Sequence, residues 1–197
     1  MSQFLALTEF ISRNAEWYPE KTAIVFKGQK LSWKAFNQRI NRIANRLLQS
    51  GLAKGDRVAI LSRNCLEYPE IMFGALKAGA AIVPMSTMLQ KETVQLQLRD
   101  SDPEAIFAGF EDLPLLEQNL STKHRIVLGG QAEDWIPYEE FLRAGPEDEP
   151  VISLAEDDLC YIIYSSGTTG TPKGIVHTQS RGRFLSLLPR TGCLHPG

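Results

Sequence analysis

The sequence has no long uninterrupted hydrophobic run. The apolar stretch Phe4–Leu7 is followed by Glu9, Arg13 and Glu16, which end it before a secretory h-region is complete. No apolar run approaches the roughly 20 residues that a membrane-spanning helix needs. We therefore expect neither a secretory signal nor a transmembrane segment, and only peripheral contact with a membrane stays open.

Cysteine and histidine are both scarce. The three cysteines, Cys65, Cys160 and Cys193, lie far apart and form no CxxC pair, so a zinc or redox motif has no support. The three histidines also lack metal-ligand spacing: His124, His177 and His195. We expect reduced, structural thiols and a cytoplasmic protein.

Charge of one sign is not in excess either. The formal net charge is -2, which gives no basic surplus to attract nucleic acid, so any phosphate binding must come from a local site. A hydrophobic content of 43% and a charged content of 22% are ordinary for a globular protein. A chain of 197 residues has room for one α/β domain or part of a larger one.

The first third of the chain predicts a hairpin and a helix. Residues 22–26 and 30–33 flank Lys27-Gly28-Gln29, which predicts two strands of a small edge ribbon. From Ser32, a candidate N-cap, apolar residues recur at helical spacing as far as Gly51. We expect a helix over this interval.

A strand-helix-strand unit follows. Arg57 to Leu61 predicts a strand, Pro69 suits the first position of a helix, and the run Ile71 to Ala78 ends at Gly79. The next residues, 81–83, are typical of a buried strand. This order predicts a parallel βαβ unit.

The middle of the chain continues the alternation. Residues 94–98 alternate with period two, which favours a strand, although their polar flanks would also suit a short helix. Strands are predicted at 105–108 and 126–128, with a helical stretch at 113–120 between them, which favours an open, mostly parallel sheet. The polar residues 144–158 predict a solvated connecting loop.

The residues with the clearest chemical meaning lie near the C-terminal end. Two β-prone runs, 159–164 and 175–177, flank a segment rich in Ser, Thr and Gly, from Ser165 to Gly174. Glycines allow close approach of the backbone to a ligand, aligned N–H groups bind anions, and Lys173 adds a positive charge for phosphate oxygens. A flexible surface loop is the alternative, and the ordered Pro172-Lys173 between two glycines counts against it.

Two common nucleotide motifs are excluded in this segment. A Walker A loop requires Gly-Lys followed by Ser or Thr after four spacer residues, and a dinucleotide fingerprint requires GxGxxG, but neither spacing is present. Readings as an ordinary P-loop NTPase or a Rossmann dehydrogenase therefore lose support.

Residues 164–174 resemble the signature of the adenylate-forming superfamily of AMP-forming acyl-CoA synthetases, luciferases and peptide-synthetase adenylation domains. The resemblance extends upstream through 19–23, 55–60 and 76–80, and covers about residues 5–178. It implies an α/β fold, the N-terminal portion of the large domain over 1–178, with a mostly parallel sheet, flanking helices and an incomplete architecture. It also implies a helix after Lys91, and it leaves 179–197 as an atypical or truncated tail.

The resemblance also implies a reaction and a binding site. A carboxylate attacks the α-phosphate of ATP to give acyl-AMP and pyrophosphate, and a thiol, usually of coenzyme A, then displaces AMP; Mg²⁺ accompanies the ATP. By position, the nucleotide phosphates would be held by Ser165, Ser166, Gly167, Thr168, Thr169, Gly170 and Lys173, with Ser165 near the Mg²⁺. No catalytic residue is assigned within the chain, because the loop binds phosphates and is not a nucleophile.

Three hypotheses remain open. The family's adenine, ribose and magnesium motifs and its mobile C-terminal domain have no counterpart here, so a ligase chain inactive by itself is the leading hypothesis, with a fatty acid as the first-choice substrate. A non-catalytic module that binds ATP or pyrophosphate is the second. A structural remnant with uncovered sheet edges and no ligand is the third.

Overall fold

A seven-stranded, mostly parallel sheet forms the centre of the molecule. The computed structural model describes residues 6–117, 120–165 and 172–180. The strand order is β7-β6-β5-β3-β4-β8-β9, and only β8 and β9 pair antiparallel. The strands are β3 (Arg57–Leu61), β4 (Ala81–Met85), β5 (Ala105–Gly109), β6 (His124–Leu128), β7 (Ile136–Pro137), β8 (Leu159–Ser165) and β9 (Lys173–Thr178). The α/β class and the parallel sheet are thus confirmed.

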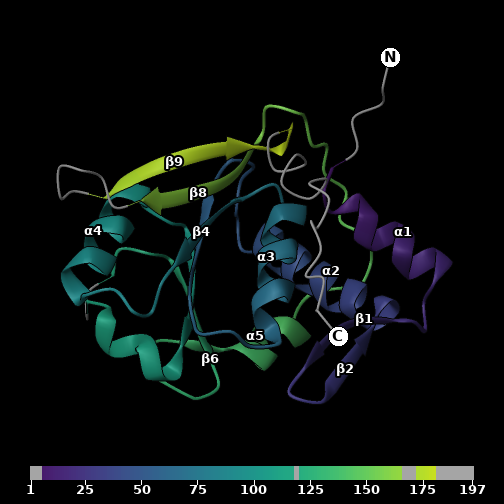
Figure 1. Cartoon of the computed structure of the whole chain (residues 1–197), viewed down its shortest axis with the longest axis horizontal. Coiled ribbons are helices and arrows are strands. Elements are labelled where there is room, and N and C mark those ends of the chain that lie inside the picture. The colour runs from purple at the N-terminus through teal and green to yellow at the C-terminus, as the bar shows by residue number, and fades with distance from the viewer. Residues whose placement is uncertain (1–5, 118–119, 166–171, 181–197) are drawn as a thin grey trace, which may run out of the picture.

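Helices cover both faces of this sheet (Figure 1). They are α1 (Glu9–Trp17), α2 (Trp33–Gln49), α3 (Glu67–Lys77), α4 (Lys91–Ser101), α5 (Tyr138–Arg143) and the 3-10 helix η1 (Phe110–Leu115). One apolar cluster lies beneath α2, α3 and α5, and a second lies beneath α4 and η1. Successive side chains of strand β3 point to opposite faces of the sheet, so both faces are buried. Val58 and Ile60 belong to the first cluster, and Ala59 and Leu61 belong to the second. Within the described ranges, no helix is both long and apolar enough to cross a bilayer.

The predicted hairpin and long helix are both present. Strands β1 (Thr22–Phe26) and β2 (Gln29–Ser32) pair antiparallel, and Lys27 and Gly28 turn the chain with φ of 47° and 83°. The hairpin forms a small two-stranded sheet of its own and does not pair with the seven-stranded sheet. Helix α2 begins where Ser32 Oγ accepts a hydrogen bond from the Ala35 amide at 3.2 Å.

The βαβ unit is confirmed with one shift in position. Strands β3 and β4 are parallel neighbours, and α3 connects them. Pro69 is the third residue of α3, because the helix begins at Glu67, two residues earlier than predicted. The position tolerates proline because the first four N–H groups of a helix have no partner within it.

The other elements agree with the sequence-based expectations only in part. Residues 94–98 are helical in α4, as the family resemblance implies, because Val94 and Leu98 lie one turn apart and are buried in the core. The helical stretch predicted at 113–120 was wrong: the chain forms a 3-10 helix over Phe110–Leu115, with Pro114 inside it. The elements α1, β7 and α5 were not predicted at all.

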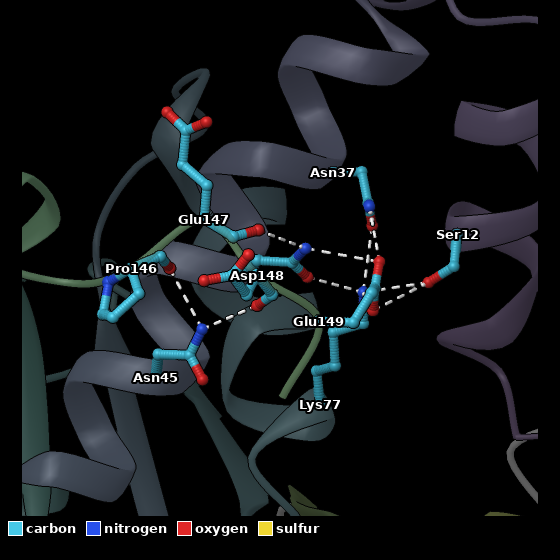
Figure 2. A network of polar contacts seen from close by, with 9 residues as sticks. Ser12, Asn37, Asn45, Lys77, Pro146, Glu147, Asp148 and Glu149 are labelled. Atoms are coloured by element: carbon cyan, nitrogen blue, oxygen red, sulfur yellow. Dashed lines mark hydrogen bonds and ion pairs between the residues drawn. The ribbon is translucent and has the colours of Figure 1, made fainter. Parts of the chain in front are cut away.

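The connecting segment 144–158 is a largely exposed loop, as expected, and polar contacts also hold it against helices. Asn45 Nδ2 donates to the carbonyls of Pro146 and Asp148 at 3.0 and 2.7 Å. Glu149 forms an ion pair with Lys77 at 2.5 Å, and Figure 2 shows these contacts converging from α1, α2 and α3. Polar composition alone could not reveal them, because the partners Asn45 and Lys77 lie far earlier in the chain.

Candidate phosphate-binding hairpin

Strand β8 carries the candidate site to the carboxyl edge of the sheet. It pairs parallel with β4 through Ile82 and Tyr161, so Ser165 at its end lies toward the same edge as Leu61 and Met85, where β3 and β4 end. In open α/β sheets, ligands bind outside the carboxyl ends of the strands. The sheet therefore presents this hairpin on the side where a nucleotide site is expected.

The antiparallel pairing brings the two described ends of the site together. Ser165 and Lys173 are register partners, the pair closest to the segment that joins β8 to β9, and both are exposed. A hydroxyl donor and an ammonium group thus stand side by side at the end of one hairpin. The predicted site residues Ser166, Gly167, Thr168, Thr169 and Gly170 lie outside the described residues.

The next pair in the register has a tight packing requirement. Gly174 lies opposite Tyr164, and a Cβ atom at Gly174 would be 3.0 Å from Ile162 Cγ2 and 3.3 Å from two atoms of the Tyr164 ring. Glycine at this position therefore lets the aromatic ring lie against the neighbouring backbone. The sequence identified Gly174 only as the end of the motif.

Tyr164 is also tied to a helix that the sequence did not connect with the site. Its hydroxyl donates to Asp100 Oδ2 in the last turn of α4 at 2.5 Å. Burial raises the pKa of the Tyr164 phenol well above its usual range, and the Asp100 carboxylate raises it further. The phenol is therefore a protonated donor at neutral pH. No local signal could have paired these residues, which are 64 positions apart.

The described residues offer few other reactive groups near the hairpin. Cys160 on β8 is buried, and burial raises the pKa of its thiol to about 12, which leaves it protonated. His124 on β6 lies with Nε2 3.1 Å from the Ser50 carbonyl oxygen, a contact that joins secondary-structure elements. Within the ranges that the structure describes, no group of three or more His, Cys, Asp or Glu side chains could hold a metal ion. Cys193 and His195 lie outside those ranges.

A cavity of about 380 Å³ lies at another point of the same sheet edge, where β3, β5 and β6 end. It is lined in part by Ser62, Gly109 and Asp112. Burial raises the pKa of the Asp112 carboxyl. Its lining carries charges of both signs, Arg63 and Glu111 among them, so it does not favour polyphosphate as the hairpin does.

The strand order, the hairpin register and the motif together define an adenylate-forming type of N-terminal domain, and the chain belongs to the AMP-binding enzyme family. The family model, described as AMP-binding enzyme, matches residues 11–187. This match confirms the resemblance that the motif at 164–174 indicated.

Several of the relatives are named as acid–CoA ligases. The chain is 37% identical over 153 residues to the long-chain-fatty-acid–CoA ligase FadD13 of Mycobacterium tuberculosis. The matched region covers 76% of this chain and 30% of that ligase. It is 34% identical over 196 residues to the crotonobetaine/carnitine–CoA ligase of Citrobacter koseri, covering 91% and 37%. The chain thus spans about a third of the length of the curated relatives it matches.

Solved structures agree with these relatives. The anthranilate CoA ligase AuaEII in complex with anthranoyl-AMP superposes with a TM-score of 0.85 at 28% identity, over 91% of this chain and 36% of that one. The N-terminal domain of FACL13 from Mycobacterium tuberculosis gives a TM-score of 0.77 at 31% identity, over 89% and 45%. The fold of the family's N-terminal region is therefore shown.

Proposed function

We propose that this chain supplies the ATP-phosphate-binding part of an AMP-forming acid–CoA ligase. The observation that carries the proposal is the pairing of Ser165 with Lys173 at the carboxyl edge of the sheet, at the two ends of a motif typical of this family. The ligase would convert a carboxylic acid and ATP to acyl-AMP and pyrophosphate, and then transfer the acyl group to the thiol of coenzyme A.

The proposed role of the hairpin is to bind and orient phosphates. Lys173 places an ammonium group where negative charge develops on the pyrophosphate leaving group, which stabilises the transition state as well as the bound nucleotide. The hydroxyl of Ser165 adds a donor beside it. The remaining residues of the motif, from Ser166 to Gly170, are proposed to contribute backbone N–H groups and hydroxyls to the same phosphates.

Magnesium would enter this site with the nucleotide. The described residues provide a hydroxyl oxygen, on Ser165, and no carboxylate cluster, which fits an ion that binds mainly to phosphate oxygens and water. When bound, Mg²⁺ would neutralise phosphate charge.

The free thiols of Cys65 and Cys160 support a reducing, cytoplasmic setting.

The acid substrate is proposed to be a fatty acid. The support is the identity to the ligase of Mycobacterium tuberculosis named for long-chain fatty acids, although relatives named for carnitine and benzoate substrates match over more of the chain. Non-catalytic binding of ATP or pyrophosphate is the second candidate function, because the chain spans only about a third of those ligases.

The test is acid-dependent release of pyrophosphate from Mg-ATP by the purified chain, over a panel of fatty and aryl acids. Lys173→Ala is expected to abolish both release and Mg-ATP binding. Lys30→Ala is the matched control, because Lys30 is also an exposed lysine and lies on the separate β1–β2 hairpin. It is expected to change neither.

The outcomes separate the candidate functions. Mg-ATP binding without release, lost in Lys173→Ala, supports the phosphate-binding role and contradicts ligase activity of the isolated chain. A folded chain that binds neither Mg-ATP nor pyrophosphate contradicts the phosphate-binding proposal and leaves the structural remnant.

A further inference from the structure

The hydrogen bond between Tyr164 and Asp100 joins a distant helix to the residue directly before the candidate phosphate site. Tyr164 is the neighbour of Ser165 in β8, and its ring lies against Gly174, the neighbour of Lys173 in β9. Any movement of this ring therefore acts on both strands at the end where Ser165 and Lys173 face each other.

The bond is not needed to satisfy buried groups. Asp100 is exposed and Tyr164 is only partly buried, so water could serve both if the bond were absent. Asp100 is also unfavourable for its own helix, because a negative charge in the last turn of α4 opposes the helix dipole. An acidic residue that costs α4 some stability and forms a short, charge-assisted bond has a role outside α4.

We propose that Asp100 is a positioning residue for the phosphate site and that it acts through Tyr164. The bond fixes the Tyr164 ring against Gly174, and the ring in turn holds the spacing of Ser165 and Lys173. This inference rests on the proposed function, because it assigns Asp100 and Tyr164 to the same nucleotide site.

The experiment measures Mg-ATP binding to the whole 197-residue chain by titration calorimetry. Tyr164→Phe and Asp100→Ala are each expected to weaken binding by about threefold to tenfold, the range for loss of one hydrogen bond. The double variant is expected to bind no more weakly than either single variant, because both remove the same interaction. Asp100→Asn keeps an acceptor and is expected to recover part of the loss.

Tyr161→Phe is the matched control. Tyr161 lies on the same strand, but its ring packs against the cluster on the opposite face of the sheet from Tyr164. It is expected to bind Mg-ATP as the unmodified chain does. Circular dichroism and the melting temperature establish that each variant is folded.

Amide hydrogen exchange at residues 165 and 173 provides a readout that does not depend on nucleotide. Tyr164→Phe is expected to speed exchange there, and Tyr161→Phe is not. If the unmodified chain fails to bind Mg-ATP, the proposed function fails, and faster exchange in Tyr164→Phe alone still supports the positioning role. Unchanged exchange in Tyr164→Phe, with or without nucleotide binding, overturns it.

Discussion

At the scale of single residues, Glu70 on α3 is a carboxyl group with no solvent exposure. Arg39 Nε lies 2.7 Å from its Oε1, and the Tyr138 hydroxyl donates to Oε2 at 2.5 Å. Burial raises the pKa of this carboxyl, and the bonds from Arg39 and Tyr138 oppose that shift. The cluster links α2, α3 and α5, so its loss would affect the packing on one whole face of the sheet.

Arg39→Ala is therefore expected to lower the free energy of unfolding by about 3 kcal/mol, because it leaves a buried carboxyl without its cation. The double variant Arg39→Ala/Glu70→Gln is expected to be more stable than Arg39→Ala. Urea unfolding measures both. Arg13→Ala is the control, since Arg13 and its partner Glu9 are about half exposed and 3.8 Å apart, and it should cost under about 1 kcal/mol. Equal losses in Arg39→Ala and Arg13→Ala would contradict this account.

For the candidate site, the sequence predicted single-residue roles only where a motif carried them. Lys173 and Ser165 could be predicted as phosphate-binding residues because their order among glycines and hydroxyls is specific. Asp100 could not, because its contact with Tyr164 depends on how α4 crosses the sheet. The role of Glu70 could not be predicted either, because its partners come from helices before and after it in the chain.

At the scale of elements, the connecting segment 144–158 is held by a network centred on Lys77. Lys77 Nζ donates to Asn41 Oδ1 at 2.6 Å, and its side chain is only 7% exposed. It also pairs with Glu149 at 2.5 Å (Figure 2). A Cβ atom on Gly145 would lie 2.0 Å from the Arg42 carbonyl oxygen, so the segment also needs glycine for its close approach to α2. This segment leads directly into β8.

Glu149→Gln is expected to destabilise the chain by about 1–2 kcal/mol in urea unfolding at about pH 7, because it leaves the buried Lys77 ammonium without its counterion. Glu147→Gln is the matched control: its partner Arg42 is 29% exposed, and the loss should stay below about 1 kcal/mol. Similar losses in the two variants would count against a special role of the Lys77 pair.

The same pair predicts an acid dependence. Burial favours a higher pKa for Glu149, but hydrogen bonds from Asn37 and Lys77 outweigh it and hold the pKa below its usual value. The stabilisation is therefore present above the ordinary carboxyl pKa and is lost as pH falls through the lower folded-state value. The difference between the unmodified chain and Glu149→Gln should shrink from about pH 7 to about pH 3.

Elements were predictable where local pattern and packing agreed. Helix α2 has apolar residues at helical spacing and a capping Ser32, and both features survive in the structure. In residues 94–98 the local alternation favours a strand, whereas burial in the core selects Val94 and Leu98 at a spacing of four, and the helix that the family resemblance implies is the element that forms. The prediction at 113–120 failed because Pro114 lies within a short 3-10 turn. Helix α5 is only six residues long, and no periodic pattern of that length is distinctive.

At the scale of the whole molecule, the sheet ends in an apolar hairpin. Strand β9, the yellow strand at the top of Figure 1, is the last strand of the sheet. Among the described residues it pairs with β8 only, so its other edge is open. Ile163 and Ile175 are register partners on one face, 39% and 48% exposed. An open strand edge beside exposed aliphatic side chains is a template for pairing with another chain.

The isolated chain is therefore expected to self-associate through the β8–β9 hairpin, and Ile175→Lys is expected to shift it toward the monomer without lowering its melting temperature. Light scattering after size-exclusion chromatography measures the mass over a range of concentrations. Val25→Lys is the matched control, because Val25 is a 58% exposed aliphatic residue on the separate β1–β2 hairpin. If the unmodified chain is a monomer, or if the two lysine variants have equal effects, the β8–β9 hairpin is not the surface through which the chain self-associates. A selective effect of Ile175→Lys would mean that the same hairpin that carries Ser165 and Lys173 also drives self-association of the chain.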